Sequence, residues 1–245
     1  MKKVIIGRKP VLEAINSGEK LDSVQILYGQ SGSIITSIQV AAKKRNIKCG
    51  FVTLDKFKNL SKDENTQGVI AFKYDFKFYS SDEIIKSIPT NEIPLLLILD
   101  SIQDPHNLGA ILRTAECAGV HGVFITKHNS APLNETAIKV AAGAVSLLKI
   151  SMVNNVAQTI QELKKLGIWI AGSTLEKSKN IYDFDSKLPL AVIVGNEEKG
   201  IRKLTADNCD FLIKIPMSGK LQSLNVSVAT GIILFEIQRK RLIQV

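Results

Sequence analysis

An uninterrupted apolar run, L-L-L-I-L at residues 95–99, constrains the fold of this 245-residue chain more than any other stretch. A strand that is apolar on both faces must be covered on both faces, which is typical of a parallel sheet between layers of helices. Further strand-like stretches alternate with helical patterns downstream. The strand candidates are residues 95–100, 122–126, 147–152, 168–171, 190–194 and 211–215, and the helix candidates are residues 107–118, 135–142 and 154–166. We therefore expect an α/β domain from Pro94 onwards.

Two segments precede this domain. Residues 1–75 alternate helical and strand patterns and are interpreted as a small α/β unit of their own. Residues 76–93 contain a Ser- and Asp-rich helix start, followed by a break at Ile88-Pro89-Thr90-Asn91, and are interpreted as a linker. The expected organisation is an N-terminal domain (1–75), a linker (76–93) and a C-terminal domain (94–245).

The net charge of +9 indicates an anionic partner, and nucleic acid is the commonest reason for such a charge. The excess is shared along the chain, because residues 1–93 hold 15 basic against 10 acidic residues and the rest hold 17 against 13. A short basic cluster, Lys43, Lys44, Arg45 and Lys48, closes a predicted helix. Cations suit that end of the helix dipole, so this role and an RNA contact are equally good interpretations of the cluster.

Several classes of protein are not indicated. Cys49, Cys117 and Cys209 are odd in number and far apart, so the sequence suggests neither a disulfide framework nor a zinc site. The three histidines have no metal-binding motif. No stretch approaches membrane-spanning length, and the first apolar run is too short for a signal peptide. We expect a cytoplasmic protein without a metal or a membrane segment.

The first strand is followed by a turn and then a helix with two notable polar residues. Asp104-Pro105 is turn chemistry, and Asn107 is placed to cap the helix. Arg113 lies six residues later, less than two helical turns away. An Arg on the buried side of an apolar helix is uncommon unless it has a role or a partner. Glu116 could be an ordinary ion-pair partner, so both readings stay open.

Three Gly- or Ser-containing loops follow other strands, where ligands of parallel sheets usually bind. Residues 195–200 have the spacing of a phosphate loop but lack the Lys-Ser/Thr pair, which argues against a nucleotide triphosphatase. Residues 172–176 form a similar loop. In the third loop, Ser223 and Asn225 stand where a helix begins and its backbone N–H groups are unsatisfied. Together the loops predict a site for a small polar ligand.

These stretches also carry a resemblance. N-L-G-A-I-L-R at 107–113, G-N-E-E-K-G at 195–200 and I-P-M-S-G-K-L-Q-S-L-N-V-S-V-A at 215–229 resemble the three motifs of the SpoU (TrmH) family of RNA ribose 2′-O-methyltransferases, in the SPOUT superfamily. Residues 7–15 and 67–69 resemble the ribosomal-protein-like N-terminal domain of the branch that methylates a guanosine of 23S ribosomal RNA. Glu198 and Thr66 differ from the residues common at those places.

The resemblance implies a C-terminal domain with a trefoil knot that binds S-adenosyl-L-methionine and methylates RNA. Ribosomal RNA is the first expectation; a transfer-RNA enzyme and a catalytically silent RNA-binding protein are the alternatives. Arg113 would stabilise the developing alkoxide. The expected catalytic residues are Asn107, Arg113, Glu197, Ser223 and Asn225, and the expected cofactor contacts are Thr174, Gly195, Gly200, Ile215, Met217 and Leu224.

A homodimer is also expected. Residues 226–237 form a helical pattern with apolar residues on more than one face, including Val228, Ile232, Leu234 and Phe235. A helix that is apolar most of the way round must be covered on most sides. Burial inside one subunit would satisfy this requirement, whereas the family resemblance favours a dimer.

Overall fold

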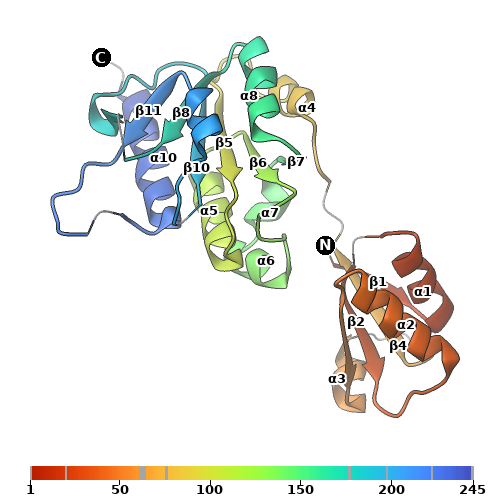
Figure 1. The fold of residues 1–245 in the computed structure, drawn as a ribbon. Helices are drawn as coiled ribbons and strands as arrows, with labels where there is room; N and C mark the ends of the chain where they lie inside the picture. The colour runs from red at the N-terminus through yellow and green to blue at the C-terminus, as the bar shows by residue number, and fades with distance from the viewer. Residues whose placement is uncertain are drawn as a thin grey trace. The chain divides into compact units, whose positions relative to one another are not determined.

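The computed structural model describes residues 2–19, 21–60, 65–74, 77–175, 178–196, 198–221 and 223–243. The chain divides into two compact units, Met1–Phe76 and Lys77–Val245, which are described separately (Figure 1).

The N-terminal unit is a mixed sheet with helices on both faces. Its strands are β1 (Lys2–Ile6), β2 (Leu21–Leu27), β3 (Lys48–Val52) and β4 (Val69–Tyr74), in the order β1-β4-β2-β3. Strand β4 runs antiparallel to both neighbours, and β2 and β3 are parallel. Helices α1 (Arg8–Asn16) and α2 (Ser33–Lys44) cover one face, and α3 (Leu54–Leu60) covers the other through Phe57. The expected small α/β unit is confirmed, although β1 and α3 were not predicted.

The C-terminal unit contains a parallel sheet, as the buried strand predicted. Every strand pairing described in this sheet is parallel. All six residues of the central strand β5 are buried. The strands are β5 (Leu95–Asp100), β6 (Gly122–Thr126), β7 (Ile150–Val153), β8 (Trp169–Ser173), β9 (Lys179–Asn180), β10 (Leu190–Gly195) and β11 (Phe211–Lys214), in the order β7-β6-β5-β10-β8-β11-β9.

Helices cover this sheet on both faces. Helices α4 (Ser81–Lys86) and α8 (Val156–Lys165) bury apolar side chains against alternate residues of β5. Helix α5 (Pro105–Cys117) packs against α10 (Val226–Leu242) and against α6 (Glu135–Ala141). The remaining helices are α7 (Ala144–Leu147), η1 (Ile181–Asp183) and α9 (Lys203–Asp207). Residues 147–152, expected as one strand, instead include the end of α7 followed by β7.

Most of the predicted linker, residues 76–93, folds into the C-terminal unit. Ile84 of α4 is fully buried in the core of that unit. The Tyr79 N–H donates a hydrogen bond to the Ile150 carbonyl at 2.9 Å. Ser80 and Glu83 form a capping box that stabilises the start of α4. The helix is short because it ends before the break at Pro89. Asp75 and Phe76 lie outside the described residues.

Candidate cofactor and substrate site

Four neighbouring strands of the C-terminal sheet end at the same edge. In the order of the sheet they are β5, β10, β8 and β11. Asp100, the last residue of β5, pairs with Gly195, the last residue of β10. Thr174 follows β8, and its N–H donates to the Ile213 carbonyl of β11 at 3.0 Å. The loops that carry the predicted site residues therefore leave adjacent strands, at the edge where ligands of parallel sheets bind.

The loop after β10 folds back against Gly195. Asn196 and Gly200 exchange two backbone hydrogen bonds, at 3.0 and 2.9 Å. The Asn196 side-chain oxygen accepts hydrogen bonds from the N–H groups of Glu198 and Lys199 at 3.0 and 3.1 Å. A Cβ on Gly195 would stand 2.1 Å from the Gly200 carbonyl carbon, so only glycine fits here. Glu197, a predicted catalytic residue, lies outside the described residues.

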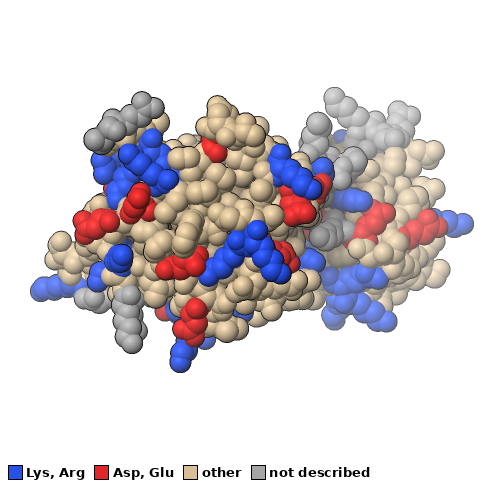
Figure 2. All heavy atoms as spheres, turned by 90° about the horizontal axis from the view of Figure 1, so that it is seen from above, with Lys and Arg blue, Asp and Glu red and all other residues tan. Residues whose placement is uncertain are grey.

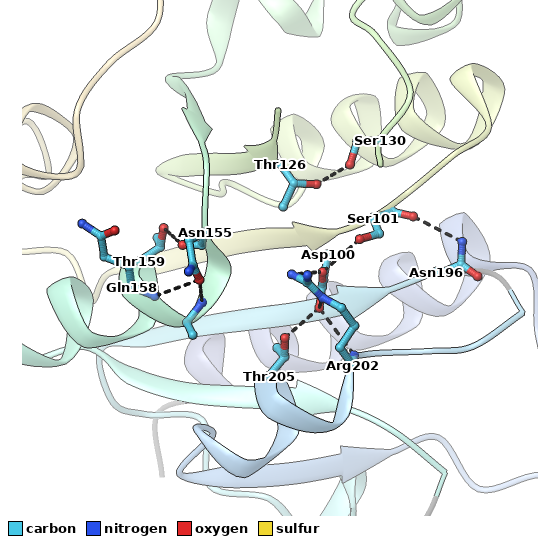
Figure 3. A network of polar contacts seen from close by, with 11 residues as sticks. Asp100, Ser101, Thr126, Ser130, Asn155, Gln158, Thr159, Asn196, Arg202 and Thr205 are labelled. Carbon is cyan, nitrogen blue, oxygen red and sulfur yellow. Dashed lines mark hydrogen bonds and ion pairs between the residues drawn. The ribbon is translucent and has the colours of Figure 1, made fainter. Parts of the chain in front are cut away.

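A buried carboxylate anchors the segment that follows this loop. Asp100 is fully buried, and Figure 3 shows Arg202 and Thr205 pointing to it from beyond the loop. Arg202 Nη2 lies 2.8 Å from Asp100 Oδ1, and the Thr205 hydroxyl donates to Oδ2 at 2.8 Å. A buried charge is tolerated only when it is paired and hydrogen-bonded. Asp100 thus ties the end of β5 to the segment after β10.

Sequence reasoning missed Asp100 as a site residue. The available signal was an acidic residue at the end of a fully apolar strand. Such a residue is buried together with the strand and therefore needs a polar partner. The partners Arg202 and Thr205 lie 102 and 105 residues away. Local spacing therefore could not reveal them.

We expect Asp100→Asn to weaken both the fold and the binding of the cofactor proposed below. Loss of the charge-assisted hydrogen bonds should lower the free energy of unfolding by about 1–3 kcal/mol. Release of the loop beside Gly195 should also lower cofactor affinity by about tenfold. Denaturant unfolding and titration calorimetry measure the two effects.

Asp210→Asn is the matched control for this prediction. Asp210 pairs with Lys164 at 2.7 Å and accepts from the Ile170 N–H at 2.9 Å, near the start of β8 and away from the ligand edge. It should lose stability without losing cofactor affinity. Equal effects of the two substitutions on affinity would refute a positioning role for Asp100.

The first and third motifs meet through two asparagines. Asn225 Nδ2 donates to Asn107 Oδ1 at 3.0 Å. Asn225 also caps α10, because its side-chain oxygen accepts from the Ser227 and Val228 N–H groups at 2.9 and 3.4 Å. The expected helix start at Asn225 is confirmed.

The prediction that Asn107 caps α5 is wrong. Asp104 is the N-cap, since its carboxylate accepts from the His106 N–H at 2.9 Å, and Pro105 occupies the first helical position. Asn107 lies within the first turn instead. Its side chain accepts a hydrogen bond from Asn225 of the third motif and does not cap its own helix.

Arg113 is exposed on α5, which corrects the expectation that it lies on the buried side. The buried stripe of the helix contains Leu108, Ile111, Leu112 and Ala115, and Arg113 lies beside this stripe. Among the residues that the structure describes, no ion pair joins Arg113 to Glu116. An exposed guanidinium without this partner can bind an anionic substrate.

The described part of the loop between β11 and α10 has backbone groups without protein partners. Within its described residues, 216–221 and 223–224, no hydrogen bond to another part of the chain is formed. Ile215 is buried, Met217 is half-buried, and Ser223 and Leu224 are exposed. Backbone N–H and C=O groups that lack protein partners can bind a polar ligand. The predicted cofactor contacts in this loop fit such a role.

Cys209 lies next to Thr205 of the Asp100 anchor but is not a candidate nucleophile. Its thiol donates to the Thr205 carbonyl at 3.2 Å. Burial raises the pKa of the Cys209 thiol to about 12, so the thiol stays protonated at neutral pH. Over the described ranges, no group of three His, Cys, Asp or Glu side chains is placed to hold a metal ion. The described helices also include none with the length and apolar character needed to cross a membrane.

An α/β domain with converging loops at the carboxyl edge of a parallel sheet defines a class of ligand-binding proteins, and comparisons with known proteins define the family. Residues 94–235 match the SpoU rRNA Methylase family, and residues 4–73 match the domain described as RNA 2′-O ribose methyltransferase substrate binding. The chain belongs to the SpoU family and is an RNA methyltransferase. The resemblance of its motifs is thereby confirmed.

Relatives and solved structures agree with this family. The chain is 37% identical over 242 residues to a putative TrmH family tRNA/rRNA methyltransferase, YacO, of Bacillus subtilis, covering 97% of this chain and 95% of the relative. It is 39% identical to a Staphylococcus haemolyticus protein of the same description, covering 97% and 96%. An AdoMet-bound rRNA methyltransferase from Sinorhizobium meliloti has a TM-score of 0.64 and 25% identity, covering 99% of this chain and 88% of that one.

Proposed function

We propose that the chain is an S-adenosyl-L-methionine-dependent ribose 2′-O-methyltransferase that acts on a guanosine of 23S ribosomal RNA. The observation that carries this proposal is the convergence of the three motif loops at one edge of the sheet, with Asn107 bonded to Asn225. The AdoMet-bound Sinorhizobium meliloti enzyme supports the choice of cofactor. The match of residues 4–73 to a 2′-O ribose substrate-binding domain supports the ribose as the acceptor.

The cofactor would be held by backbone groups of three loops. Gly195 and Gly200 bracket the turn after β10, and the described residues after Ile215 have backbone groups without protein partners. We assign Met217 and Leu224 to the same site, because they belong to the loop after β11 whose described residues form no hydrogen bond to other parts of the chain. We assign Thr174 to it because Thr174 follows β8, the strand between β10 and β11. A trefoil knot formed by these loops is part of this proposal.

In methyl transfer, the ribose hydroxyl is the group that the protein must activate. When bound, S-adenosyl-L-methionine supplies a methyl group that its sulfonium charge already activates. A ribose hydroxyl is a poor nucleophile at neutral pH, so the protein must align it and stabilise negative charge on its oxygen. Arg113 performs the stabilisation in our proposal. A guanidinium rarely accepts a proton, so we assign Arg113 the stabilising role and not that of the base.

The other predicted catalytic residues have positioning roles in this proposal. Asn107 and Asn225 form one hydrogen-bonded unit that joins α5 to α10, and this unit orients the ribose or Arg113. Ser223, two residues before Asn225, is exposed and lines the same part of the site in this proposal. Glu197 would fix the loops or Arg113.

Binding of the cofactor separates an enzyme from a silent RNA-binding protein. Titration calorimetry should detect saturable binding of S-adenosyl-L-methionine, and of its demethylated product, to the wild-type chain. Absence of binding of both compounds at several salt concentrations would favour the RNA-binding protein.

Transfer RNA is the second candidate substrate. A TrmH/SpoU tRNA modifying enzyme of A. aeolicus is 36% identical to this chain, with a TM-score of 0.57. The match covers only 61% of this chain and 76% of the A. aeolicus chain. Mapping of ribose methylation in total RNA from cells with and without the gene distinguishes the two substrates. A methylated nucleotide lost from transfer RNA would exclude the ribosomal assignment.

We also propose that the chain forms a homodimer through α10. Leu234 is buried within the subunit, whereas Val228, Phe235 and Leu242 are exposed at intervals of seven residues. Side chains with this spacing lie along one face of a helix. Burial of this apolar face is favourable, and a second copy of the chain can bury it.

We expect Phe235→Asp to convert the dimer to a monomer, because a buried charge in an apolar interface is strongly unfavourable. Light scattering should give about twice 26.8 kDa for the wild type and that mass itself for the variant. The exposed Leu204→Asp on α9 is a control that should remain dimeric. A wild-type mass near 26.8 kDa at all concentrations would reject the dimer.

The N-terminal unit would supply most of the RNA affinity. The match of residues 4–73 to a substrate-binding domain supports this assignment. In Figure 2 the Lys and Arg side chains are scattered among other side chains, in line with the even division of the charge along the sequence. Phosphate contacts dominate such binding, so RNA affinity should fall steeply with salt.

A further inference from the structure

One edge of the N-terminal sheet gathers several loops. Strands β1, β2 and β3 end at this edge and β4 begins there. The Gly7 N–H donates to the Val69 carbonyl at 3.0 Å, and the Leu27 N–H donates to the Gly68 carbonyl at 2.9 Å. The loops after β1 and β2 therefore flank the loop before β4. Neighbouring strands lie about 4.8 Å apart, so the four strand ends span about 15 Å.

Arg8 is held in a fixed orientation at this edge. Its Nε donates to the Gln67 carbonyl at 3.0 Å, and its Nη2 donates to the Gln30 side-chain oxygen. The Gln67 side chain in turn accepts from the Arg8 N–H at 3.1 Å. In the part of the unit that the structure describes, Arg8 Nη1 has no protein partner. The guanidinium is thus oriented in advance, with donor capacity left for a ligand.

Two aromatic rings stand exposed at the same edge. Tyr28 follows β2 and is 78% exposed, and Phe51 near the end of β3 is 44% exposed. Their ring centroids are 6.3 Å apart in an edge-to-face arrangement. The Tyr28 N–H donates to the Val52 carbonyl at 2.8 Å, which fixes the backbone beneath the ring. Exposed aromatic rings beside cationic side chains are the elements of a surface that stacks unpaired bases.

The charge of this edge matches nucleic acid. The described segments 7–10, 28–33 and 65–68 contain Arg8 and Lys9 and no acidic residue, and the start of α3 after β3 adds Asp55 together with Lys56. Helices α1 and α2 also begin here, with Gly7 and Gly32 at their N-caps. The Gln67 side chain accepts from the first N–H of α1, whereas no described side chain caps the first N–H groups of α2. These features add positive potential around the aromatic rings.

The basic cluster noted in the sequence lies at the opposite edge. Lys48 begins β3, and Lys43 and Lys44 form the last turn of α2, where cations complement the helix dipole. Arg45 Nη2 donates to the Asn16 carbonyl at 2.7 Å and so closes the end of α1. The place of Lys43 and Lys44 in the last turn of α2 and the contact of Arg45 favour the dipole interpretation over the RNA interpretation.

We propose that Arg8, Lys9, Tyr28, Phe51 and Gln67, here named the aromatic edge, bind unpaired nucleotides of the RNA substrate. The two rings stack on bases, Arg8 and Lys9 contact the flanking phosphates, and Gln67 holds Arg8 in place. Bases in a duplex stack on one another and do not offer their faces to these rings, so the ligand is single-stranded. This inference rests on the proposed function, because it locates where the methylated RNA is held.

Anisotropy titrations of the full chain with a labelled short single-stranded RNA, and with the same strand in a duplex, test the proposal. Tyr28→Ala and Phe51→Ala should each weaken single-strand binding by about 5- to 100-fold and leave the salt dependence unchanged. Lys9→Ala should instead reduce the slope of log affinity against log salt by about one. Tyr28→Phe should bind like the wild type.

Lys43→Ala and Lys44→Ala are the matched controls from the opposite edge, and they should change affinity less than the aromatic variants. Wild-type affinity in Tyr28→Ala and Phe51→Ala, or duplex binding as tight as single-strand binding, would overturn the proposal. Melting curves of each variant confirm that the exposed positions do not affect folding. A chain that binds single-stranded RNA through this edge but transfers no methyl group would support the surface and overturn the proposed function.

Discussion

Replacing Arg113 by alanine should slow methyl transfer about 10²- to 10³-fold and leave the fold and cofactor affinity close to those of the wild type. Removal of one donor that stabilises a developing oxyanion has an effect of this size. Arg113 is exposed, so its loss creates no cavity. Single-turnover methylation at saturating RNA and cofactor measures the chemical step, and titration calorimetry measures cofactor affinity.

Two further variants sharpen this prediction. Arg113→Lys should recover only part of the rate, because a point charge does not reproduce the planar guanidinium. Glu116→Ala should leave the rate unchanged, since Arg113 does not depend on Glu116. If Arg113→Ala lowered the melting temperature and kept the wild-type single-turnover rate, the catalytic assignment would be wrong.

Gly195→Ala should reduce the single-turnover rate about 10²-fold and weaken cofactor binding. The new Cβ would stand 2.2 Å from both the Gly200 oxygen and the Ile201 nitrogen, and these backbone atoms can move only if the whole loop shifts. A displacement of about 1 Å at a positioning element is enough for a rate loss of this size. Calorimetry and methylation assays with the same preparation measure the two losses.

Gly219→Ala is the control for this substitution. Gly219 belongs to the neighbouring loop after β11, and a Cβ there would meet no atom within 4 Å. We expect its stability to equal that of the wild type, which separates steric displacement from a general effect of alanine in these loops. Unchanged cofactor affinity in Gly195→Ala would show that the turn after β10 does not form the cofactor site.

The parallel sheet could be predicted because burial on both faces leaves a direct mark on the sequence. The apolar run of β5 and the alternation with helices were sufficient. Strand β1 was missed because Lys2 and Lys3 precede only three apolar residues, and β9 because it has only two residues. Residues 147–152 were misread since Leu147 and Leu148 extend the apolar pattern of β7 backwards into a helix end.

The candidate site was predictable where the chemistry is local. Asn225 precedes an apolar helix and caps it through its own side chain. Asp104 took the capping position expected for Asn107 because it immediately precedes Pro105, which suits the first helical position. The Asn107–Asn225 bond joins residues 118 positions apart, and the Asp100 anchor joins residues more than 100 apart. Such contacts follow from the order of strands in the sheet, which local sequence patterns do not specify.

Transfer of a labelled methyl group from S-adenosyl-L-methionine to ribosomal RNA tests the central claim most directly. The RNA should come from cells that lack the gene, so that the target nucleotide is unmodified, and the product should be digested to nucleosides. We predict 2′-O-methylguanosine as the labelled product of the wild-type chain, with little or none from Arg113→Ala. A labelled methyl group on a base, or an RNA that remains unlabelled although the chain binds the cofactor, would contradict the proposed ribose methylation.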